Sequence, residues 1–598
     1  MHLSRIRISN FRNFSELDVK LAGSIVVVGE NRVGKSNLLF ALRLIFDPTL
    51  PDSARQLGLS DFWDGLNGPS ADDKIIVSVE IQAFEGDLDI LALLTDYRLD
   101  DDPETVRLSY EFRPRAELET DPASGDDYEF VCYGGESEAK RFGHDLRRRI
   151  TMDVLPALRD AEGDLATWRR SPLRPLIENA FRNVDREDLQ EISEAVEGVR
   201  AQIIEFEEVE SLQGSIGALF AEMSGPKQDI KPCLGFSPTD PTRLYRNIRL
   251  LIDEGARGIN DASLGSANLV FLTLKTLEIR RILEENRRDY TLLAIEEPEA
   301  HLHPHLQRSV YRHLFQSLQN TGDERSSISV FLTTHSPHIA SVAPLPSILL
   351  LKETADSGTI GCSTASIDLT QPDIDDLARY LDVTRAEMLF ARGVILVEGD
   401  AERFLVPTFA ETIEKPLDYF GITVCSVAGT NFLPYAKFLT GLCIPFSIIT
   451  DWDPQTTGNP LGYSRAKKLI RTIVQVRSGR VSAEIEAELR GASGDELCTL
   501  AAGYGIFLND HTLEVDLFRD KFAPAITTTL REAEFGPTRR RWIDAWEANP
   551  EELNVERFLF LIDSIGKGRF AQMLTSRLGG LEPPAYIREA IEFVADRV

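Results

Sequence analysis

The 598-residue sequence has no apolar run long enough to cross a membrane. Apolar stretches such as residues 24–29 and 348–351 are far shorter than the roughly 20 residues that a membrane helix requires. Residues 1–8 contain no uninterrupted apolar core of signal-peptide length. We therefore expect a cytoplasmic protein that does not contact a membrane.

Cysteine is also scarce, and no two cysteines form a C-x-x-C pair. The absence of that spacing argues against a structural zinc site and against a dithiol redox motif. Scattered cysteines are typical of proteins from a reducing compartment. The six are Cys132, Cys233, Cys362, Cys425, Cys443 and Cys498.

Positive charge is in deficit, since 65 Lys and Arg face 95 Asp and Glu, for a net charge of −30. This balance argues against a protein that coats nucleic acid non-specifically. It is compatible with a DNA enzyme, because divalent metals held by carboxylates can neutralise phosphates locally. The length predicts two to four domains, and 43% apolar residues are ordinary for a globular chain.

A complete phosphate-binding loop is present near the N-terminus. A buried strand at residues 24–28 leads into a Gly-x-x-x-x-Gly-Lys-Ser segment and then into an apolar helical stretch at 37–46. Glycines let backbone amides face phosphates, Lys35 reaches the β and γ oxygens, and Ser36 can ligate Mg²⁺. The predicted ATP-binding residues here are Gly29, Asn31, Gly34, Lys35 and Ser36.

Two later strands end in polar residues that suit the same nucleotide. Residues 291–295 lead to Glu296, which we assign to the metal, and to Glu297, which we assign to the attacking water. Residues 329–333 lead to His335, which we expect beside the γ-phosphate.

Two small residues, Ser263 and Gly265, open a long helical segment whose N-terminus would suit a phosphate from another subunit. The histidines at 301, 303 and 305 have a rival interpretation as a zinc site. Their spacing shares a face only on a strand, however, whereas Pro304 and the pattern after it favour a loop that enters a helix.

Together these motifs resemble ABC-type ATPases of the RecF/SMC branch. The resemblance rests on the phosphate loop and on the runs Asn-Phe-Arg-Asn-Phe (10–14), Glu-Glu-Pro-Glu-Ala-His-Leu-His-Pro (296–304) and Thr-His-Ser-Pro (334–337). It implies that ATP is sandwiched between two heads, with residues 263–266 in the place of the signature motif. That segment lacks the usual Ser-Gly-Gly, and Gln56 and Gln82 are both candidates for the glutamine loop.

Between the ATPase motifs, residues 150–250 do not continue the strand-rich pattern, and residues 176–220 carry apolar residues at helical intervals with many acids between them. We predict an insertion of two or more helices. Its apolar stripe could pack on a core of its own, or it could form a dimerisation arm, because a nucleotide sandwich needs two heads. Amphipathicity alone does not distinguish the two.

A second domain begins between residues 370 and 392 and places acids at strand ends. Residues 393–397 stop at Glu398, which is followed by Glu402, and residues 445–450 stop at Asp451 and Asp453. Acids at the carboxyl ends of neighbouring parallel strands repel one another, and that arrangement persists when divalent cations bind between them. Asp400, between the two glutamates, is the uncertain member of this group.

A third strand, at residues 505–508, precedes Glu514, and a later turn presents Lys567. Oxygen ligands favour Mg²⁺ or Mn²⁺ over zinc. Two such ions about 4 Å apart would stabilise the attacking and leaving oxygens of a phosphodiester. We therefore predict a metal site formed by Glu398, Glu402, Asp451, Asp453 and Glu514.

In this domain Glu-x-x-x-Glu followed by Asp-x-Asp resembles the Toprim fold of topoisomerases, primases and nucleases. No tyrosine stands out as a topoisomerase nucleophile. An ABC head followed by a C-terminal Toprim domain resembles the OLD (overcoming lysogenisation defect) nuclease family. The segment Gly566-Lys567-Gly568 resembles that of its class 2, which includes the nuclease subunit of Gabija defence systems. The resemblance implies that Lys567 stabilises transition-state charge.

The predicted fold class is α/β, with an ABC-type ATPase head built on a mixed sheet, a helical insertion and a C-terminal Toprim α/β domain. The predicted ranges are 1–149 and 251–380 for the head, 150–250 for the insertion and 381–598 for the Toprim domain.

The leading hypothesis is an ATP-regulated, divalent-metal-dependent endonuclease that cuts double-stranded phage DNA. We expect a homodimer or homotetramer, with a UvrD-like helicase as a candidate partner. The alternative is a non-nucleolytic RecF/SMC-like repair or recombination ATPase whose acids hold a structural ion. A primase-like polymerase is disfavoured, because no template-binding module such as a zinc ribbon is visible.

Overall fold

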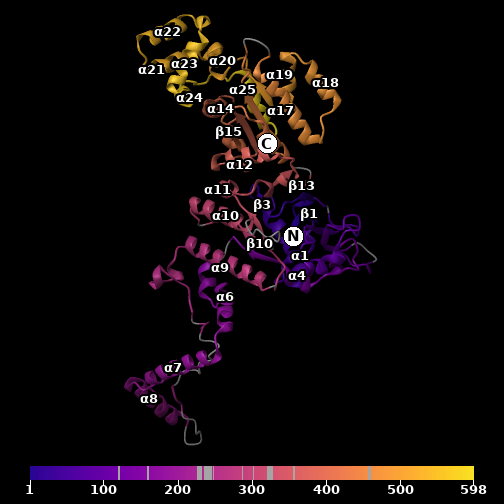
Figure 1. The fold of residues 1–598 in the computed structure, drawn as a ribbon, viewed down its shortest axis with the longest axis vertical. Helices are drawn as coiled ribbons and strands as arrows, with labels where there is room; N and C mark the ends of the chain where they lie inside the picture. Colours follow the sequence, from indigo (N-terminus) through magenta and orange to yellow (C-terminus); the bar gives the residue numbers. More distant parts are fainter. Residues whose placement is uncertain are drawn as a thin grey trace. The chain divides into compact units, whose positions relative to one another are not determined.

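The computed structural model describes residues 1–598 except 67, 119–121, 158–159, 225–231, 235–244, 247, 286, 301, 320–327, 355–356, 381 and 456–458. The chain divides into two compact units, one formed by residues 1–157 with 290–598 and the other by residues 158–289 (Figure 1). Within the described residues, no helix is long and apolar enough to span a bilayer.

The first unit contains a large mixed sheet of 11 strands within the described chain, in the order β6-β5-β4-β1-β2-β13-β12-β3-β11-β10-β7. Strand β3 pairs in parallel with β11 and β12, and β10 pairs in parallel with β11 and β7. The strands are β1 (His2–Phe11), β2 (Phe14–Lys20), β3 (Ile25–Val28), β4 (Ile75–Gln82), β5 (Val106–Pro114), β6 (Tyr128–Gly134), β7 (Ile150–Leu155), β10 (Tyr290–Glu296), β11 (Ile328–Thr333), β12 (Ile348–Thr354) and β13 (Gly358–Ser363).

Strand β3 is buried on both faces, as its uninterrupted Ile-Val-Val-Val run predicts for a central parallel strand. Helix α1 (Lys35–Phe46) follows it and buries its apolar face against β7, β5 and β4. The helices around this sheet include α2 (Asp52–Arg55), α3 (Leu88–Leu94), α4 (His144–Arg149), α10 (Pro304–Gln319) and α11 (Pro337–Ala340).

A second sheet in the same unit has four parallel strands in the order β15-β14-β16-β17. These are β14 (Gly393–Val397), β15 (Ile422–Ser426), β16 (Phe446–Thr450) and β17 (Ile506–Leu508). Helices of this part are α12 (Gln371–Tyr380), α13 (Val383–Ala386), α14 (Asp400–Thr412), α15 (Leu417–Phe420), α16 (Leu433–Gly441), α17 (Leu461–Ser478), α18 (Ala483–Gly491), α19 (Gly494–Gly503) and α25 (Ala585–Ala595). Because all four strands run the same way, their carboxyl ends share one edge.

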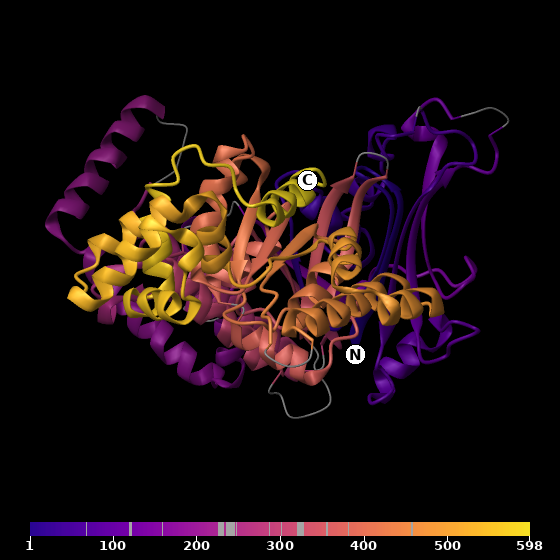
Figure 2. The same ribbon diagram turned by 90° about the horizontal axis from the view of Figure 1, so that it is seen from above.

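A cluster of helices precedes α25, drawn in light orange and yellow in Figure 2. Its members are α20 (Leu513–Leu517), α21 (Ala523–Glu532), α22 (Pro537–Ala548), α23 (Val555–Ile565) and α24 (Lys567–Thr575). Helix α24 packs against α14, and Gly568 approaches Asp400 so closely that a Cβ would lie 3.1 Å from the Asp400 Cβ. This packing brings Lys567 to the helix that follows Glu398.

The second unit is helical apart from the short strands β8 (Leu251–Ile252) and β9 (Arg257–Gly258). Its helices are α5 (Ala161–Ala166), α6 (Leu173–Ala180), α7 (Arg186–Ile204), α8 (Glu207–Ser224) and α9 (Leu264–Glu284). Helices α7 and α8 leave large apolar side chains exposed, namely Ile192, Val199, Ile203, Leu212, Ile216, Leu219 and Met223. These exposed side chains form an apolar stripe along the described parts of α7 and α8.

The predicted fold class, a mixed-sheet head followed by a second α/β domain, is confirmed. The compact units do not coincide with the predicted domain ranges, which remain predictions. Residues 150–155, assigned to the insertion, form β7 of the large sheet, because their alternating register continues the parallel pairing with β10. Helix α9, assigned to the head, lies in the second unit.

Candidate nucleotide site and candidate carboxylate site

The phosphate loop joins β3 to α1, and two of its glycines have backbone angles that favour glycine. Gly29 has φ +149° and Gly34 has φ +90°. The Lys35 side chain is buried, and its Nζ donates to the carbonyl oxygens of Gly29 at 3.0 Å and Glu30 at 2.8 Å. Burial lowers the pKa of Lys35 to about 8, against the opposing effect of Glu297 and Glu299. Backbone carbonyl groups of the loop therefore accept the hydrogen bonds of the loop's own lysine.

The loop is braced by the Asn-Phe-Arg-Asn-Phe segment, whose physical role the sequence alone does not reveal. Asn13 Nδ2 donates to the Val33 carbonyl at 3.0 Å, and Asn13 Oδ1 accepts from Asn37 Nδ2 at 2.6 Å. A Cβ at Gly34 would lie 2.0 Å from Asn13 Nδ2. Arg12 Nη1 completes the network by donating to Asn37 Oδ1 at 2.9 Å. Gly34 is therefore required by packing as well as by its φ angle.

The carboxyl ends of β10 and β11 lie next to that of β3, as the parallel pairing requires. Glu296 ends β10, and Glu297 follows it with φ +40° and its amide bonded to the Thr333 carbonyl. His335 Nε2 lies 3.5 Å from a Glu297 carboxylate oxygen. Burial and Lys35 lower the pKa of His335, although Glu297 opposes them.

Glu299, to which the sequence analysis gave no role, holds the loop that carries His335. Its carboxylate accepts from the His335 amide at 2.6 Å and from Thr334 Oγ1 at 2.9 Å. The sequence signal was present in the Glu-Glu-Pro-Glu run, but the partner lies 36 residues away. The structure thus brings Lys35, Glu296, Glu297 and His335 to one sheet edge.

Other predicted residues of the nucleotide site lie elsewhere. Ser263 caps α9 in the second unit, with its Oγ 3.0 Å from Ser266 Oγ, and Gly265 is in the first turn of that helix. Gln56 donates to the Tyr128 carbonyl at 2.9 Å, and Gln82 to Thr105 Oγ1 at 2.8 Å. Of the histidine run, the rings of His303 and His305 stack, whereas His301 is outside the described residues.

The second site lies at the carboxyl edge of the four-stranded sheet. Glu398 follows β14, and its Oε1 accepts hydrogen bonds from Thr450 Oγ1 at 2.6 Å and from the Asp451 amide at 2.9 Å. Asp451 follows β16, and its Oδ1 accepts from Asn509 Nδ2 at 2.5 Å. Asn509, which follows β17, was missed by the sequence analysis because an amide gives no carboxylate signal. Three adjacent strand ends therefore meet through these side chains.

Arg465 on α17 is the other residue that the sequence analysis missed. Its Nη1 donates to Glu398 Oε1 at 2.9 Å, and its Nη2 donates to Asp453 Oδ2 at 2.8 Å. The guanidinium also bonds to Thr450 Oγ1 and to the Asp451 carbonyl. Only 12% of the Arg465 side chain is exposed. A buried cation therefore joins the acids that follow β14 and β16.

Glu402 and Glu514 complete the acidic group, and both are buried. Glu402 caps its own helix by accepting from the Gly399 amide at 3.2 Å, while Glu514 pairs with Lys567 Nζ at 3.2 Å. Burial, with Glu514 and Glu398 nearby, raises the pKa of Glu402 to about 7. Burial, with Glu398 and Glu402 nearby, raises the pKa of Asp451 to about 8. Burial is the main cause of both raised pKa values, and the neighbouring carboxylates add to it.

These residues fit a divalent ion in donor chemistry and in charge. All the side-chain donors are oxygens, which suit Mg²⁺ or Mn²⁺, and a cation would relieve the repulsion that raises the Asp451 pKa. No group of three or more His, Cys, Asp or Glu side chains within the described chain is already arranged to hold an ion. Instead, Arg465 bridges Glu398 and Asp453, and Lys567 pairs with Glu514.

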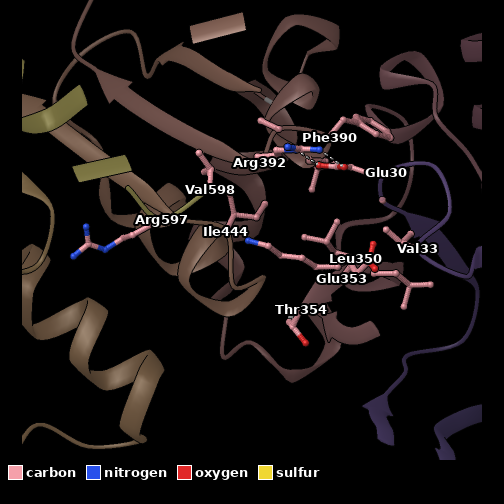
Figure 3. A pocket seen from close by; sticks show the side chains of 15 residues that line it. Glu30, Val33, Leu350, Glu353, Thr354, Phe390, Arg392, Ile444, Arg597 and Val598 are labelled. Carbon is pink, nitrogen blue, oxygen red and sulfur yellow. Dashed lines mark hydrogen bonds and ion pairs between the residues drawn. The ribbon is translucent and has the colours of Figure 1, made fainter. Parts of the chain in front are cut away.

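The phosphate loop and the start of β14 face each other across a cavity (Figure 3). Arg392, the residue before β14, donates from Nε and Nη2 to the Glu30 carboxylate at 2.7 and 3.0 Å. Its backbone amide donates to the Gly421 carbonyl at 2.9 Å. Arg597 lines the same cavity and points away from this ion pair. A two-bond ion pair therefore links the loop to the strand that ends in Glu398.

Two known families match this chain. The family described as AAA ATPase domain matches residues 1–130 and 162–340, together more than half of the chain. The family described as overcoming lysogenization defect protein-like, TOPRIM domain, matches residues 389–453, which include Glu398, Asp451 and Asp453.

Two known nucleases resemble about three quarters of the chain. It is 25% identical to the OLD nuclease of Thermus scotoductus over 462 residues, which cover 75% of this chain and 82% of that protein. It is 22% identical to endonuclease GajA of Bacillus cereus over 470 residues, covering 76% and 75% of the two chains. The solved C-terminal region of the Burkholderia pseudomallei OLD protein is 41% identical, with 35% of this chain and 98% of that one covered and a TM-score of 0.30.

The AAA ATPase match includes the phosphate loop, and the TOPRIM match includes the acids after β14 and β16. The chain therefore belongs to the AAA ATPase domain family, and it carries a Toprim domain like that of the overcoming lysogenization defect proteins.

Proposed function

We propose that this protein is an ATP-regulated, divalent-metal-dependent DNA endonuclease. The observation that carries the proposal is the meeting of Glu398, Asp451 and Asp453 around Arg465 at one sheet edge. The same compact unit contains a complete phosphate loop. The relatives named OLD nuclease and endonuclease GajA support a nuclease. A structural ion site would not need Lys567, a half-exposed cation, beside the acids.

In the carboxylate site, Glu398, Glu402, Asp451, Asp453 and Glu514 would hold the metal. Two divalent ions bound there would activate water and stabilise the attacking and leaving oxygens of a phosphodiester. Asn509 fixes one oxygen of Asp451 and leaves the other free to bind, since both Asn509 and the Leu513 amide donate to Oδ1. Lys567, beside Glu514, would stabilise charge that develops on the scissile phosphate.

In the nucleotide site, the backbone of Gly29, Asn31 and Gly34 would face the phosphates of ATP, and Lys35 would reach the β and γ oxygens. Ser36 and Glu296 would hold Mg²⁺, Glu297 would orient water and His335 would contact the γ-phosphate. Ser263 and Gly265, at the N-terminus of the 21-residue helix α9, would approach the phosphate of a second copy.

The exposed stripe on α7 and α8 is proposed to bring the two copies together. Along α8 the exposed apolar residues Leu212, Ile216, Leu219 and Met223 are spaced by four, three and four residues, the pattern of a coiled-coil seam. An apolar stripe of this regularity on the surface of a unit marks a protein interface. Closed symmetric dimers are the commonest assembly that such a stripe forms.

ATP would regulate the carboxylate site through the Glu30–Arg392 ion pair. Lys35 is bonded to the Glu30 carbonyl and has to leave it to reach a phosphate. Because the Glu30 side chain holds Arg392, a shift of residue 30 is passed to the residue before β14, and β14 ends at Glu398. Both partners are about half exposed, which limits the contribution of the pair to roughly 1 kcal/mol or less.

The substrate we propose is double-stranded DNA, and the biological role we propose is defence against phage, which the resemblance to the nuclease subunit of Gabija defence systems implies. The site of action would be the cytoplasm, where a UvrD-like helicase is a candidate partner. Because the chain carries a net charge of −30, DNA has to be held by local cations such as Lys567 and by the metal itself.

The catalytic assignment predicts that Glu398→Gln and Asp451→Asn each lower plasmid nicking with Mg²⁺ or Mn²⁺ by at least about a hundredfold, as expected for groups that stabilise transition-state charge. Binding of a fluorescent ATP analogue should be unchanged. Glu582→Gln, on an exposed loop before α25, is the control and should nick normally. Wild-type protein that binds ATP but fails to nick would instead favour a non-nucleolytic ATPase.

The bridging role of Arg465 predicts that Arg465→Met lowers the free energy of unfolding by roughly 3 kcal/mol in EDTA, because it leaves partly buried acids without their cation. Mg²⁺ should then raise the melting temperature of the variant more than that of the wild type. Arg471→Met is a matched control on the same helix, since Arg471 pairs with Glu486 at a more exposed position. Equal melting behaviour of the two variants would contradict the bridging role.

The proposed role of the Glu30–Arg392 ion pair predicts that Arg392→Ala reduces the effect of ATP on the nicking rate by about two- to fivefold. This factor corresponds to the contribution of an exposed ion pair. The doubly exchanged variant, with Glu30→Arg and Arg392→Glu, should recover part of the effect. Arg597→Ala, in the same cavity but held by Phe593, should leave the ATP effect unchanged. An unaltered ATP effect in Arg392→Ala would remove this contact from the regulation.

The proposed interface at the exposed stripe on α7 and α8 predicts that Ile216→Glu combined with Leu219→Glu reduces the molar mass in solution to that of a monomer. The reason is that two buried charges per copy oppose association. Ala218→Glu, on the opposite face of α8, should leave the assembly intact. Light scattering after size-exclusion chromatography measures both. A double variant that keeps the wild-type mass would place the interface elsewhere.

A further inference from the structure

We propose that Cys362 and Cys443 form a redox-sensitive thiol pair, which peroxide converts into a disulfide that fastens the ATPase sheet to the Toprim domain. The two cysteines are 81 positions apart in the sequence, and only Cys362 lies in a strand. Cys362 is in β13, opposite Leu350 of β12, whereas Cys443 is in the turn between α16 and β16. The two thiols influence each other, since each is the largest cause of the shift in the pKa of the other.

The contact between these segments is close along its length. Gly441, two residues before Cys443, approaches Ile367 so closely that a Cβ would lie 2.4 Å from the Ile367 side chain. On the other side, Ile444 lines the same cavity as Leu350, the partner of Cys362 in the sheet. The backbone on both sides of Cys443 is therefore held against the part of the head that carries Cys362.

The surroundings favour reaction at Cys443 and resolution by Cys362. Cys443 is exposed, and it lines a cavity that also contains Lys437, Arg471 and Arg477. Cys362, together with Lys352 and Arg477, lowers the pKa of Cys443. Cys443 and burial raise the pKa of Cys362. An exposed thiolate beside a protonated partner thiol is the arrangement found in redox-sensing cysteine pairs.

The chemistry requires only hydrogen peroxide as oxidant. The Cys443 sulfur attacks one peroxide oxygen, the O–O bond breaks, and the products are a sulfenic acid and water. The Cys362 sulfur then attacks the sulfenic sulfur, an S–S bond forms and a second water leaves. In sum, two thiols lose two electrons and two protons to one peroxide, and thiol reductants reverse the reaction.

The resulting bond would close a loop that contains β14 and Glu398. Because Cys362 is in the large sheet and Cys443 precedes β16, the bond would tie the carboxylate-bearing sheet to the head at a second place, apart from the Glu30–Arg392 ion pair. Peroxide would thus limit the movement that ATP causes between the two sites.

The test is a peroxide titration of the full-length protein, followed by alkylation, proteolysis without reductant and mass spectrometry. We expect a peptide that links Cys362 to Cys443, present in the wild type and in Cys498→Ser, and lost after treatment with dithiothreitol. Before oxidation, iodoacetamide should label Cys443 at pH 7 about tenfold faster than Cys498, in proportion to its thiolate fraction.

A second variant makes the outcome independent of whether a Cys443 substitution folds. In Cys362→Ser the resolving thiol is absent, so peroxide should leave Cys443 as a sulfenic acid that dimedone captures. Absence of both the linked peptide in the wild type and the dimedone adduct in this variant would overturn the proposal. Linkage of either cysteine to a different one would do the same. These readouts do not depend on whether the protein cuts DNA.

Discussion

The crowding of carboxylates at the carboxyl edge of a parallel sheet is the constraint on which the second half of this protein depends. Asp451 and Glu402 are buried beside Glu398 and Glu514, and the pKa of Asp451 rises to about 8 as a result. Such a group is stable only if cations offset it. Arg465 from α17 and Lys567 from α24 supply them, and α24 packs against α14, the helix that follows Glu398.

The same geometric rule builds the nucleotide site. Strands β3, β11 and β10 run in parallel, so the phosphate loop reaches the same edge as His335 and Glu296, although Glu296 lies 260 residues after Ser36 in the sequence. Each site then uses a strand-to-helix turn. In the first turn, the absence of a Cβ at Gly34 leaves room for the Asn13 side chain. In the second turn, the Gly399 amide donates to Glu402. Loop glycines are used here for close approach and helix capping.

The sequence predicted what is encoded locally and missed what is encoded by long-range contact. The phosphate loop and the acids after β14 and β16 were identified because strand, turn and helix are contiguous there. Arg465 was missed because it sits 67 residues after Glu398, inside an ordinary amphipathic helix. Asn509 was missed because an amide carries no charge pattern, and Asn13 was noted only as part of the run at 10–14, without a role. The fold class followed from the strand-ending motifs, whereas the ends of the insertion depend on pairing between β7 and β10, which no local pattern specifies.

The Glu30–Arg392 ion pair, which links the two proposed sites, is weak, and its weakness limits how much of the proposed ATP effect it can transmit. Coupling between distant sites typically amounts to 1–3 kcal/mol, whereas an ion pair as exposed as Glu30–Arg392 contributes roughly 1 kcal/mol or less. The ion pair can therefore transmit only part of a full regulatory effect. The remainder has to come from a larger rearrangement, and closure of two heads on ATP is the one that the exposed stripe of α7 and α8 would support. We therefore expect that disruption of the exposed stripe on α7 and α8 weakens ATP control more than the loss of Arg392 does.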